Sequence, residues 1–294
     1  MRQRSRLRDW AEYLAALTAL YSLAWTPRPV AEWLARRYTK LLDRAIPRLR
    51  RAALENLRAA LPQLAVSEHA RITDGVFHSI ARILVSFARF PGIHRGNISQ
   101  WIRYEGFEHF TAALERGKGV LFATAHLGNW ELSAFAHSLL TAPMHFVVRP
   151  LDNRLIDALV ERRRAMSGNR LIEKKDFARS ILQALRRNEA VGILIDQNAS
   201  LDTGVFVDFF GMPASAAAGF ARIAAHSGAA VIPGFALWCA EERRYVLRFY
   251  PPLTMTGDVV RDTQAVQSQL ESVVREYPDQ WLWIHRRWKT RPQA

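Results

Sequence analysis

Hydrophobic and polar positions follow two different periods along the chain, and the change comes near residue 100. Before it, apolar residues recur every three or four positions, as they do on the buried face of an α-helix. One such stripe lies between Pro47 and Pro62, and a second runs from Ile72 to Phe87. A proline is tolerated in the first turn of a helix and closes a helix when it follows one. This pattern predicts a helical region over residues 1–100.

From about residue 104, short apolar runs alternate with longer helical stretches. The expected strands are 119–125, 144–148, 190–195, 229–238 and 244–250, and the expected helices are 107–116, 130–140, 153–166, 176–188, 214–227 and 261–276. Strands that alternate with helices are typical of a parallel sheet with helices on both faces. We therefore predict an α/β fold with a largely parallel central sheet flanked by helices. The helical region 1–100 is interpreted as a membrane-associated layer of the same domain as the α/β core over 101–294.

The first helical stretch has the composition of a helix at a membrane interface. Arg2, Arg4, Arg6 and Arg8 precede an uncharged run, 13–27, that is shorter than the ~20 residues needed to span a bilayer. Amphipathic aromatic residues of the kind enriched at interfaces lie in and around it, namely Trp10, Tyr13, Tyr21, Trp25 and Trp33. We expect a retained interfacial helix over about 10–34, with its basic flank on the cytoplasmic side, in preference to a cleaved signal peptide. The alternative is a buried core helix.

The charge balance narrows the classes of partner. Lys and Arg number 41 against 27 Asp and Glu, which gives a net charge of +14 and a pI near 10.7. Such a surplus favours an anionic partner, which can be nucleic acid, anionic lipid headgroups or a phosphorylated substrate. The single cysteine, Cys239, excludes an internal disulfide and a cysteine-rich zinc site. The histidines have no metal-ligand spacing either, so no metal is expected.

Candidate chemistry begins where the first core strand ends. His126 directly follows the run 120–125, and ligands of open α/β sheets gather outside the carboxyl ends of the strands. Gly128 permits a tight turn there, and Asn129 is suited to cap the next helix. Such a bend would let Glu131 hold one imidazole nitrogen of His126 and make the other more basic, which suits proton removal from an alcohol. The alternative is a helix-cap histidine beside a surface glutamate.

Polar residues also follow the next two expected strands. Arg149 ends one of them, while Asp196 and Gln197 end the other. Because parallel strands end at the same edge of a sheet, we expect these residues to converge with His126. The guanidinium of Arg149 suits a phosphate or another anion, although a surface ion pair is the alternative. Asp196 would position a substrate hydroxyl or Arg149, or else cap a helix.

Two later segments are rich in aromatic residues. The C-terminal one interleaves Arg286 and Arg287 with tryptophans, a combination suited to an anionic lipid surface, an acidic carrier protein or single-stranded nucleic acid. Its alternative is a solvated charge run with partly buried tryptophans. The other, 206–213, is a hydrophobic loop that would line an acyl groove, touch the bilayer or simply belong to the core.

Taken in order, these segments resemble the lipid A late acyltransferases, which add secondary acyl chains to the lipopolysaccharide anchor and share a His-x-x-x-x-Asp/Glu motif with other glycerolipid acyltransferases. The resemblance covers nearly the full chain and is carried by residues 117–132, 147–150, 195–197, 205–214 and 281–292. Two stretches depart from the pattern: the one after Pro213 is poor in threonine, and the one after Pro233 lacks a basic residue. These departures affect the identity of the acceptor more than the chemistry.

The resemblance implies an α/β O-acyltransferase that needs no cofactor and takes its acyl chain from an acyl-carrier-protein or coenzyme A thioester. The acceptor would be a hydroxyl of a lipid A precursor or a related glycolipid at the cytoplasmic face of an inner membrane. His126 would be the general base and Glu131 its partner, in a direct transfer. The residues expected to bind substrate are Asn129, Arg149, Asp196, Gln197, Arg286 and Arg287.

The expected partners are acyl carrier protein, anionic membrane lipids and the glycolipid acceptor, and no nucleic acid. Three alternatives stay open: another phospholipid or glycolipid acceptor, a hydrolase that uses the same pair to activate water, and a basic nucleic-acid-binding protein. The nucleic-acid-binding alternative rests on the net charge and on the basic-aromatic C-terminal segment, since no nucleic-acid recognition motif occurs in the sequence.

Overall fold

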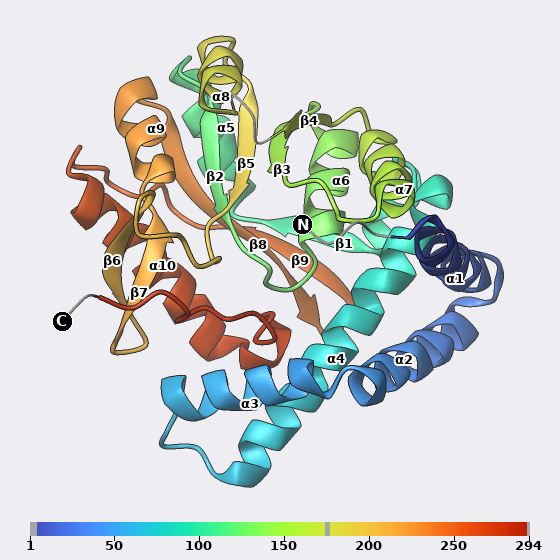
Figure 1. The fold of residues 1–294 in the computed structure, drawn as a ribbon. Helices are drawn as coiled ribbons and strands as arrows, with labels where there is room; N and C mark the ends of the chain where they lie inside the picture. The colour runs from blue at the N-terminus through green and yellow to red at the C-terminus, as the bar shows by residue number, and fades with distance from the viewer. Residues whose placement is uncertain (1–4, 174–176, 293–294) are drawn as a thin grey trace.

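The computed structural model describes residues 5–173 and 177–292, and a mostly parallel sheet forms its centre (Figure 1). Its strands are β1 (Ile102–Glu105), β2 (Val120–Thr124), β3 (His145–Val148), β4 (Arg170–Glu173), β5 (Ala190–Leu194), β8 (Ala230–Cys239) and β9 (Arg244–Phe249). They lie in the order β1-β9-β8-β2-β5-β3-β4, and each adjacent pair is parallel except β8 and β9. A separate antiparallel hairpin consists of β6 (Gly204–Phe209) and β7 (Met212–Ala217). The predicted α/β fold class is confirmed.

Alternating residues of the strands divide the core into two layers. The helices of these layers are α1 (Arg6–Trp25), α2 (Arg28–Ala45), α3 (Pro47–Ala60), α4 (Val66–Arg89), α5 (Phe107–Glu115), α6 (Trp130–Leu140), α7 (Arg154–Ala165), α8 (Phe177–Arg186), α9 (Gly219–Ser227) and α10 (Val259–Glu276). In β2, Leu121 packs in a cluster with residues of α8, α9 and α10. The next residue, Phe122, packs in a second cluster with residues of α1, α2, α5 and α6. The strand period of two thus gives each face of the sheet its own apolar core.

The N-terminal helices cover one side of the molecule (Figure 1). The expected continuous helix over 10–34 is wrong, because α1 ends at Trp25 and α2 begins at Arg28. Pro27 lies between them; proline has no N–H to donate, and it disfavours a helical conformation of the preceding residue. Among the described helices, none is long and apolar enough to cross a membrane. Arg2 and Arg4 of the expected basic flank lie outside the described residues.

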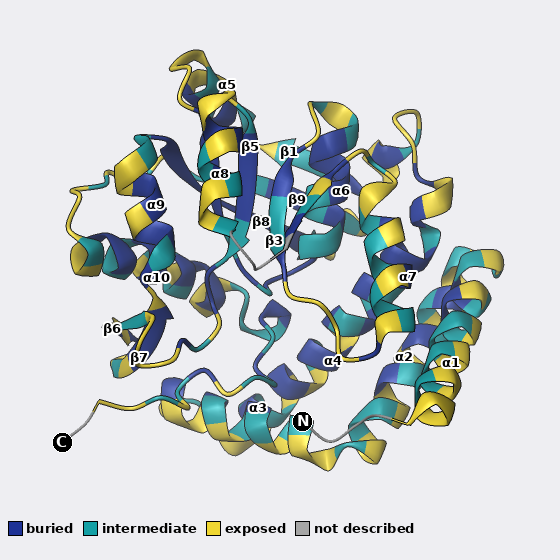
Figure 2. Cartoon of the chain, turned by 45° about the horizontal axis from the view of Figure 1, so that its top comes forward, coloured by how far each residue is buried: buried dark blue, intermediate teal, exposed yellow. Residues whose placement is uncertain are grey.

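One face of α1 is buried and another is exposed (Figure 2). Leu20 and Leu23 are buried in the core, whereas Trp10 and Trp25 are 53% and 81% exposed. The alternative of a fully buried core helix is therefore wrong for α1. Single exposed apolar side chains are common on protein surfaces, but several of them along one helix are not. The exposed leucine and tryptophan side chains of α1 therefore need a further explanation.

The five expected strands are confirmed with small changes at their ends, but β1, β4, β6 and β7 were not expected. The expected helix over 214–227 is wrong in its first part, because β7 extends to Ala217 and α9 begins at Gly219. Phe210 and Gly211, with φ of 59° and 73°, form the two-residue turn of the hairpin. Two left-handed residues are the backbone of a tight turn whose twist matches its strands. Residue 176 of the expected helix 176–188 lies outside the described residues.

Candidate active site

The loop after β2 carries His126 and then reverses sharply at Gly128. Gly128 has a φ of +62°, and a Cβ atom there would lie 1.9 Å from the carbonyl oxygen of Ala236. Its N–H donates to the carbonyl of Gln280 at 2.9 Å, and the N–H of Asn129 donates to that of Ala236 at 2.8 Å. Only glycine fits this conformation and this close approach. The two amides are thus engaged within the fold and are not free to stabilise an oxyanion.

Asp196 holds the imidazole of His126. The Nδ1 atom of His126 lies 2.9 Å from Oδ1 of Asp196, and the backbone N–H of His126 donates to Oδ2 at 2.9 Å. The indole N–H of Trp281 donates to the same Oδ2 at 3.0 Å. Asp196 is completely buried, whereas the His126 side chain keeps 14% of its surface exposed. In the described part of the chain Nε2 has no hydrogen-bond partner, so this nitrogen is available to a substrate.

The charges of this pair depend on each other. Burial alone would lower the pKa of His126, but the adjacent Asp196 carboxylate, and more weakly Glu131, raise it above the usual histidine value. Burial likewise opposes ionisation of Asp196, yet His126 and the indole N–H of Trp281 hold the pKa of this carboxyl well below its ordinary range. Asp196 is therefore a buried carboxylate at neutral pH, and it makes His126 a stronger base.

Glu131 does not form the ring contact expected of it. Its carboxylate accepts two hydrogen bonds from Arg164, at 2.9 Å from Nε and 2.5 Å from the terminal nitrogen. The indole N–H of Trp130 donates to it as well, at 3.2 Å. No hydrogen bond joins Glu131 to His126 among the described residues. The bend at Gly128 is confirmed, but it turns His126 toward the end of β5 while Glu131 faces α7.

Three residues expected to bind substrate are buried within the protein instead. Asn129 caps α6 through its side-chain oxygen and donates to Ser86, so both ends of its amide are used. Asp196 is covered by His126 and Trp281. Arg287 is also fully buried and donates to the carbonyl of Ser215 and to Gln267. Burial lowers the pKa of Arg287 to about 10. These three residues support the fold and the site through partners within the protein, and a contact of any of them with substrate stays a prediction.

The other three expected residues are exposed. Arg149 follows β3, Gln197 follows Asp196, and Arg286 precedes the buried Arg287. None of them is joined to His126 by a hydrogen bond or ion pair within residues 5–173 and 177–292. The ends of β2, β5 and β3 lie at the same edge of the sheet, as expected, because these are neighbouring parallel strands, but among the described residues hydrogen bonds join only the ends of β2 and β5. A role for the exposed residues in binding substrate stays a prediction.

The C-terminal segment is part of the core and not a surface tail. Trp281 and Trp283 are fully buried, and Phe209 and Phe210 pack against them. The hydrophobic stretch 206–213 is therefore a core hairpin, the simplest of the alternatives for it. Sequence reasoning did not assign roles to Arg164, Trp281 or His285 at the site. Nothing in the sequence distinguishes Arg164 from its neighbours Arg162 and Arg163.

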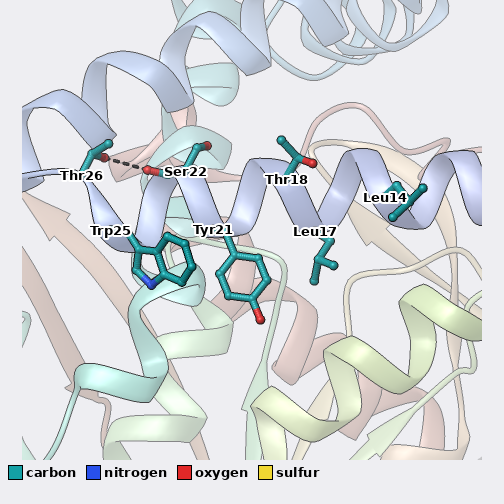
Figure 3. Close-up of a pocket in the computed structure, with 7 residues that line it drawn as sticks. All are labelled: Leu14, Leu17, Thr18, Tyr21, Ser22, Trp25 and Thr26. Atoms are coloured by element: carbon teal, nitrogen blue, oxygen red, sulfur yellow. Dashed lines mark hydrogen bonds between the residues drawn. The ribbon is translucent and has the colours of Figure 1, made fainter.

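An apolar pocket of about 500 Å³ lies on the surface of α1 (Figure 3). Seven residues line it, namely Leu14, Leu17, Thr18, Tyr21, Ser22, Trp25 and Thr26. The rings of Tyr21 and Trp25 point to the same side of the helix, with their centroids 4.9 Å apart. Within the described part of the chain, no cluster of His, Cys, Asp or Glu suits a metal ion.

Comparison with known proteins shows that this chain is similar to bacterial acyltransferases. The family model described as bacterial lipid A biosynthesis acyltransferase matches residues 1–290. The chain is 27% identical to a lipid A biosynthesis lauroyltransferase of Escherichia coli, over 98% of this chain and 94% of the relative. It is 25% identical to a lipid A biosynthesis acyltransferase of Haemophilus influenzae, over 96% and 88%. It is also 27% identical to a phosphatidylinositol mannoside acyltransferase of Mycolicibacterium smegmatis, over 80% and 79%.

Proposed function

Since the chain belongs to the bacterial lipid A biosynthesis acyltransferase family, we propose that it transfers a fatty acyl chain from an acyl-carrier-protein or coenzyme A thioester to a hydroxyl of a lipid A precursor. The observation that carries this assignment to particular residues is the His126–Asp196 pair at the ends of β2 and β5. A histidine with one nitrogen held by a buried carboxylate and the other open is the arrangement that general-base catalysis needs.

The transfer proceeds in one displacement. Because Asp196 accepts from Nδ1, the lone pair of His126 lies on Nε2, where it takes the proton of the acceptor hydroxyl. The hydroxyl oxygen then bonds to the thioester carbonyl carbon, and collapse of the tetrahedral intermediate breaks the carbon–sulfur bond. The imidazolium returns its proton to the departing thiolate. Asp196 stabilises the imidazolium between the two proton transfers and remains ionised throughout.

Glu131 acts beside this pair, through Arg164. The carboxylate orients the guanidinium of Arg164 with two hydrogen bonds, and both side chains are mostly buried. A guanidinium fixed in this way suits a phosphate of the acceptor or of the donor's pantetheine arm. Glu131 also favours the protonated form of His126 through its charge. Its loss is expected to weaken substrate binding and catalysis together, while loss of Asp196 affects catalysis.

A related glycolipid is the second candidate acceptor. The similarity to a phosphatidylinositol mannoside acyltransferase extends over 80% of this chain, and this favours a site that tolerates different sugar-containing lipids. For either acceptor we propose action at the cytoplasmic face of an inner membrane. The exposed aromatic residues of α1 and the cationic residues of α2 would meet anionic lipids there.

The chemistry is tested by reconstitution with purified protein. Wild type with acyl carrier protein or coenzyme A bearing a labelled acyl chain, together with a lipid A precursor, is expected to yield a product heavier by one acyl chain. His126→Gln is expected to lower kcat by about 10³-fold, because removal of a general base costs that much. Asp202→Asn, an exposed carboxylate change, is the matched control. Full transfer by a folded His126→Gln variant would refute the mechanism.

The acceptor is tested in cells. Lipid mass spectrometry is expected to show one acyl chain missing from the glycolipid pool when the protein is absent, and restored when it is expressed again. The mass difference gives the chain length, and fragmentation gives the acylated position. An unchanged lipid A fraction with an altered phospholipid or mannoside fraction would move the assignment to the second acceptor class.

A further inference from the structure

The carboxylate that holds His126 is itself held by the chain segment Gln280–Leu282, which we call the strap. Each of its three residues bonds to the catalytic loop or to Asp196. The carbonyl of Gln280 accepts from Gly128, and the N–H of Leu282 donates to the carbonyl of His126, both at 2.9 Å. Between them, the indole N–H of Trp281 reaches Oδ2 of Asp196 at 3.0 Å. The strap therefore contacts both members of the catalytic pair.

From this geometry we infer that Trp281 is a positioning residue for acyl transfer, whose indole N–H fixes the Asp196 carboxylate in the orientation that His126 requires. The inference rests on the proposed function of the pair. Oδ2 of Asp196 accepts from two N–H groups, those of His126 and Trp281, and Oδ1 faces the imidazole. With both acceptor directions of Oδ2 occupied, the plane of the carboxylate is set, and Oδ1 points at Nδ1.

The strap is rigidly mounted, which a positioning role requires. The side-chain amide of Gln280 makes two hydrogen bonds to the backbone of Trp238 in β8, at 2.7 and 3.1 Å. On the other side, Asn56 of α3 donates to the carbonyls of Trp283 and His285, both at 2.7 Å. Trp281 is fully buried, so its ring has no freedom to leave Asp196.

The hydrogen bond, beyond the bulk of the ring, is what matters for His126. A buried carboxylate that loses one N–H donor becomes more basic, because less of its charge is stabilised. The charged and titratable groups that face His126 are Asp196 after β5, Glu131 on α6, Arg164 on α7 and His285 beyond the strap. Of these, only Asp196 bonds to Trp281. Loss of the indole N–H is therefore expected to raise the pKa of His126 and to misorient its ring.

Trp283 provides a matched control. It is as deeply buried as Trp281, and their ring centroids are 4.6 Å apart. Its indole N–H also makes one hydrogen bond, but to the carbonyl of Pro278 at 2.7 Å. Replacement of either tryptophan removes similar packing and one buried hydrogen bond, but only the indole N–H of Trp281 donates directly to the catalytic carboxylate.

The test compares Trp281→Phe with Trp283→Phe, and repeats both with benzothienylalanine, which keeps the shape of the indole but lacks its N–H. At position 281, either replacement is expected to raise the pKa of His126 in a ¹⁵N-histidine NMR titration, with His126→Gln used for assignment. It is also expected to move the acidic limb of kcat/KM to higher pH and to lower kcat about tenfold. The same replacements at position 283 are expected to lower stability but to leave the pKa of His126 and the acidic limb of kcat/KM unchanged.

Two results would overturn the inference. One is an unchanged His126 titration with benzothienylalanine at position 281, and the other is the same shift from both positions. Because the NMR titration needs no turnover, it separates the inference from the proposed function. A wild-type protein that transfers no acyl chain would refute the function, while the response of His126 to the loss of the indole N–H would still be measured.

Discussion

At the scale of single residues, the orientation of His126 depends on a carboxylate that lies 70 positions away along the chain. Asp196→Asn is expected to keep the fold, because the amide is nearly isosteric. However, the amide of the new asparagine presents an N–H₂ group to the N–H donors that now bond to the carboxylate. The change also removes the negative charge that stabilises the imidazolium of His126. We predict a loss in kcat of about 10³-fold, which lies within the range that general-base catalysis contributes.

The same variant has a pH signature with a definite sign. His126 acts as a base and must be neutral, so activity is lost as the pH falls through its raised pKa. Without the Asp196 charge, burial lowers that pKa, and the acidic limb of the pH–rate profile moves to lower pH. This direction is opposite to that expected when Trp281 loses its N–H. A limb that stays fixed in Asp196→Asn would contradict the assignment of His126 as the titrating base.

His137 gives a prediction on stability. Its ring is buried against Phe110 and Phe122, neither ring nitrogen has a hydrogen-bond partner among the described residues, and burial lowers its pKa to about 4. Between pH 6.5 and pH 4 the unfolded chain binds a proton that the folded protein does not. Stability therefore falls by up to about 3 kcal/mol as the pH drops through this window.

His137→Leu is expected to abolish this pH dependence, because leucine does not titrate. The comparison is made by urea unfolding of wild type and variant at pH 7 and pH 4.5. His226→Leu, a change of an exposed histidine in the last turn of α9, is the control. If the variant loses as much stability on acidification as wild type does, another group causes the loss.

At the scale of elements, the turn from β2 to α6 depends on one glycine. Gly128→Ala places a Cβ atom 1.9 Å from the carbonyl oxygen of Ala236 and forces a non-glycine residue to a φ of +62°. We predict a loss of stability of about 3 kcal/mol and a larger loss of activity, because the turn sets the position of His126. Gly211→Ala, also at positive φ but with open space around it, is the control for backbone strain alone. Thermal melting of both variants measures the difference.

The sequence predicted elements best where one apolar period was long and unbroken. The helices α3 and α6 and the strands β2 and β5 were placed nearly to the residue, because each has a regular stripe or a buried run. Short edge strands such as β1 and β4 carry too few residues to show a period. The helix expected from residue 214 failed because the small residues of β7 suit either structure, and the turn at Phe210 decided between them.

The site was predictable only in part, for a related reason. His126 and Asp196 could be placed at neighbouring strand ends from the order of strands in a parallel sheet. The sequence could not show which carboxylate bonds to the His126 ring. Glu131 and Asp196 both lie near this ring, and the choice between them depends on the direction of the turn at Gly128. Trp281 joins the pair from the far end of the chain, and no local pattern indicates such a contact.

At the scale of the whole molecule, segments near both ends of the described chain are joined to elements of the catalytic site. The C-terminal strap contacts the catalytic loop. At the other end, Asn153, at the start of α7, donates to the backbone of Asp9 in α1 at 2.9 Å. Because α7 also carries Arg164, the helix with the exposed apolar face is fixed to an element of the site. If α1 lies on a membrane, as proposed above, this arrangement sets the site at a defined height above it.

The exposed side chains of α1 and α2 give the last prediction. On α1, Leu7, Trp10, Leu14, Tyr21 and Trp25 are exposed at spacings of three, four or seven residues, which places them along one stripe. On α2, Trp33 is exposed as well, and the guanidinium carbon of Arg37 lies 5.1 Å from the centroid of its ring. An aligned stripe of this kind beside cationic residues fits the interface of an anionic bilayer.

Replacing Trp10, Trp25 and Trp33 together by serine is expected to weaken binding to vesicles of phosphatidylglycerol and phosphatidylethanolamine about 100-fold, since partial burial of each side chain in the interface is worth about 1 kcal/mol. Folding is expected to be unchanged, because these side chains are 53%, 81% and 54% exposed. The matched control replaces three exposed apolar residues elsewhere, Val66, Leu201 and Val260. Co-sedimentation at rising salt separates the two contributions, because salt weakens the attraction of the cations but leaves the apolar contact. Equal vesicle binding by the two triple variants would rule out α1 and α2 as the membrane-facing surface.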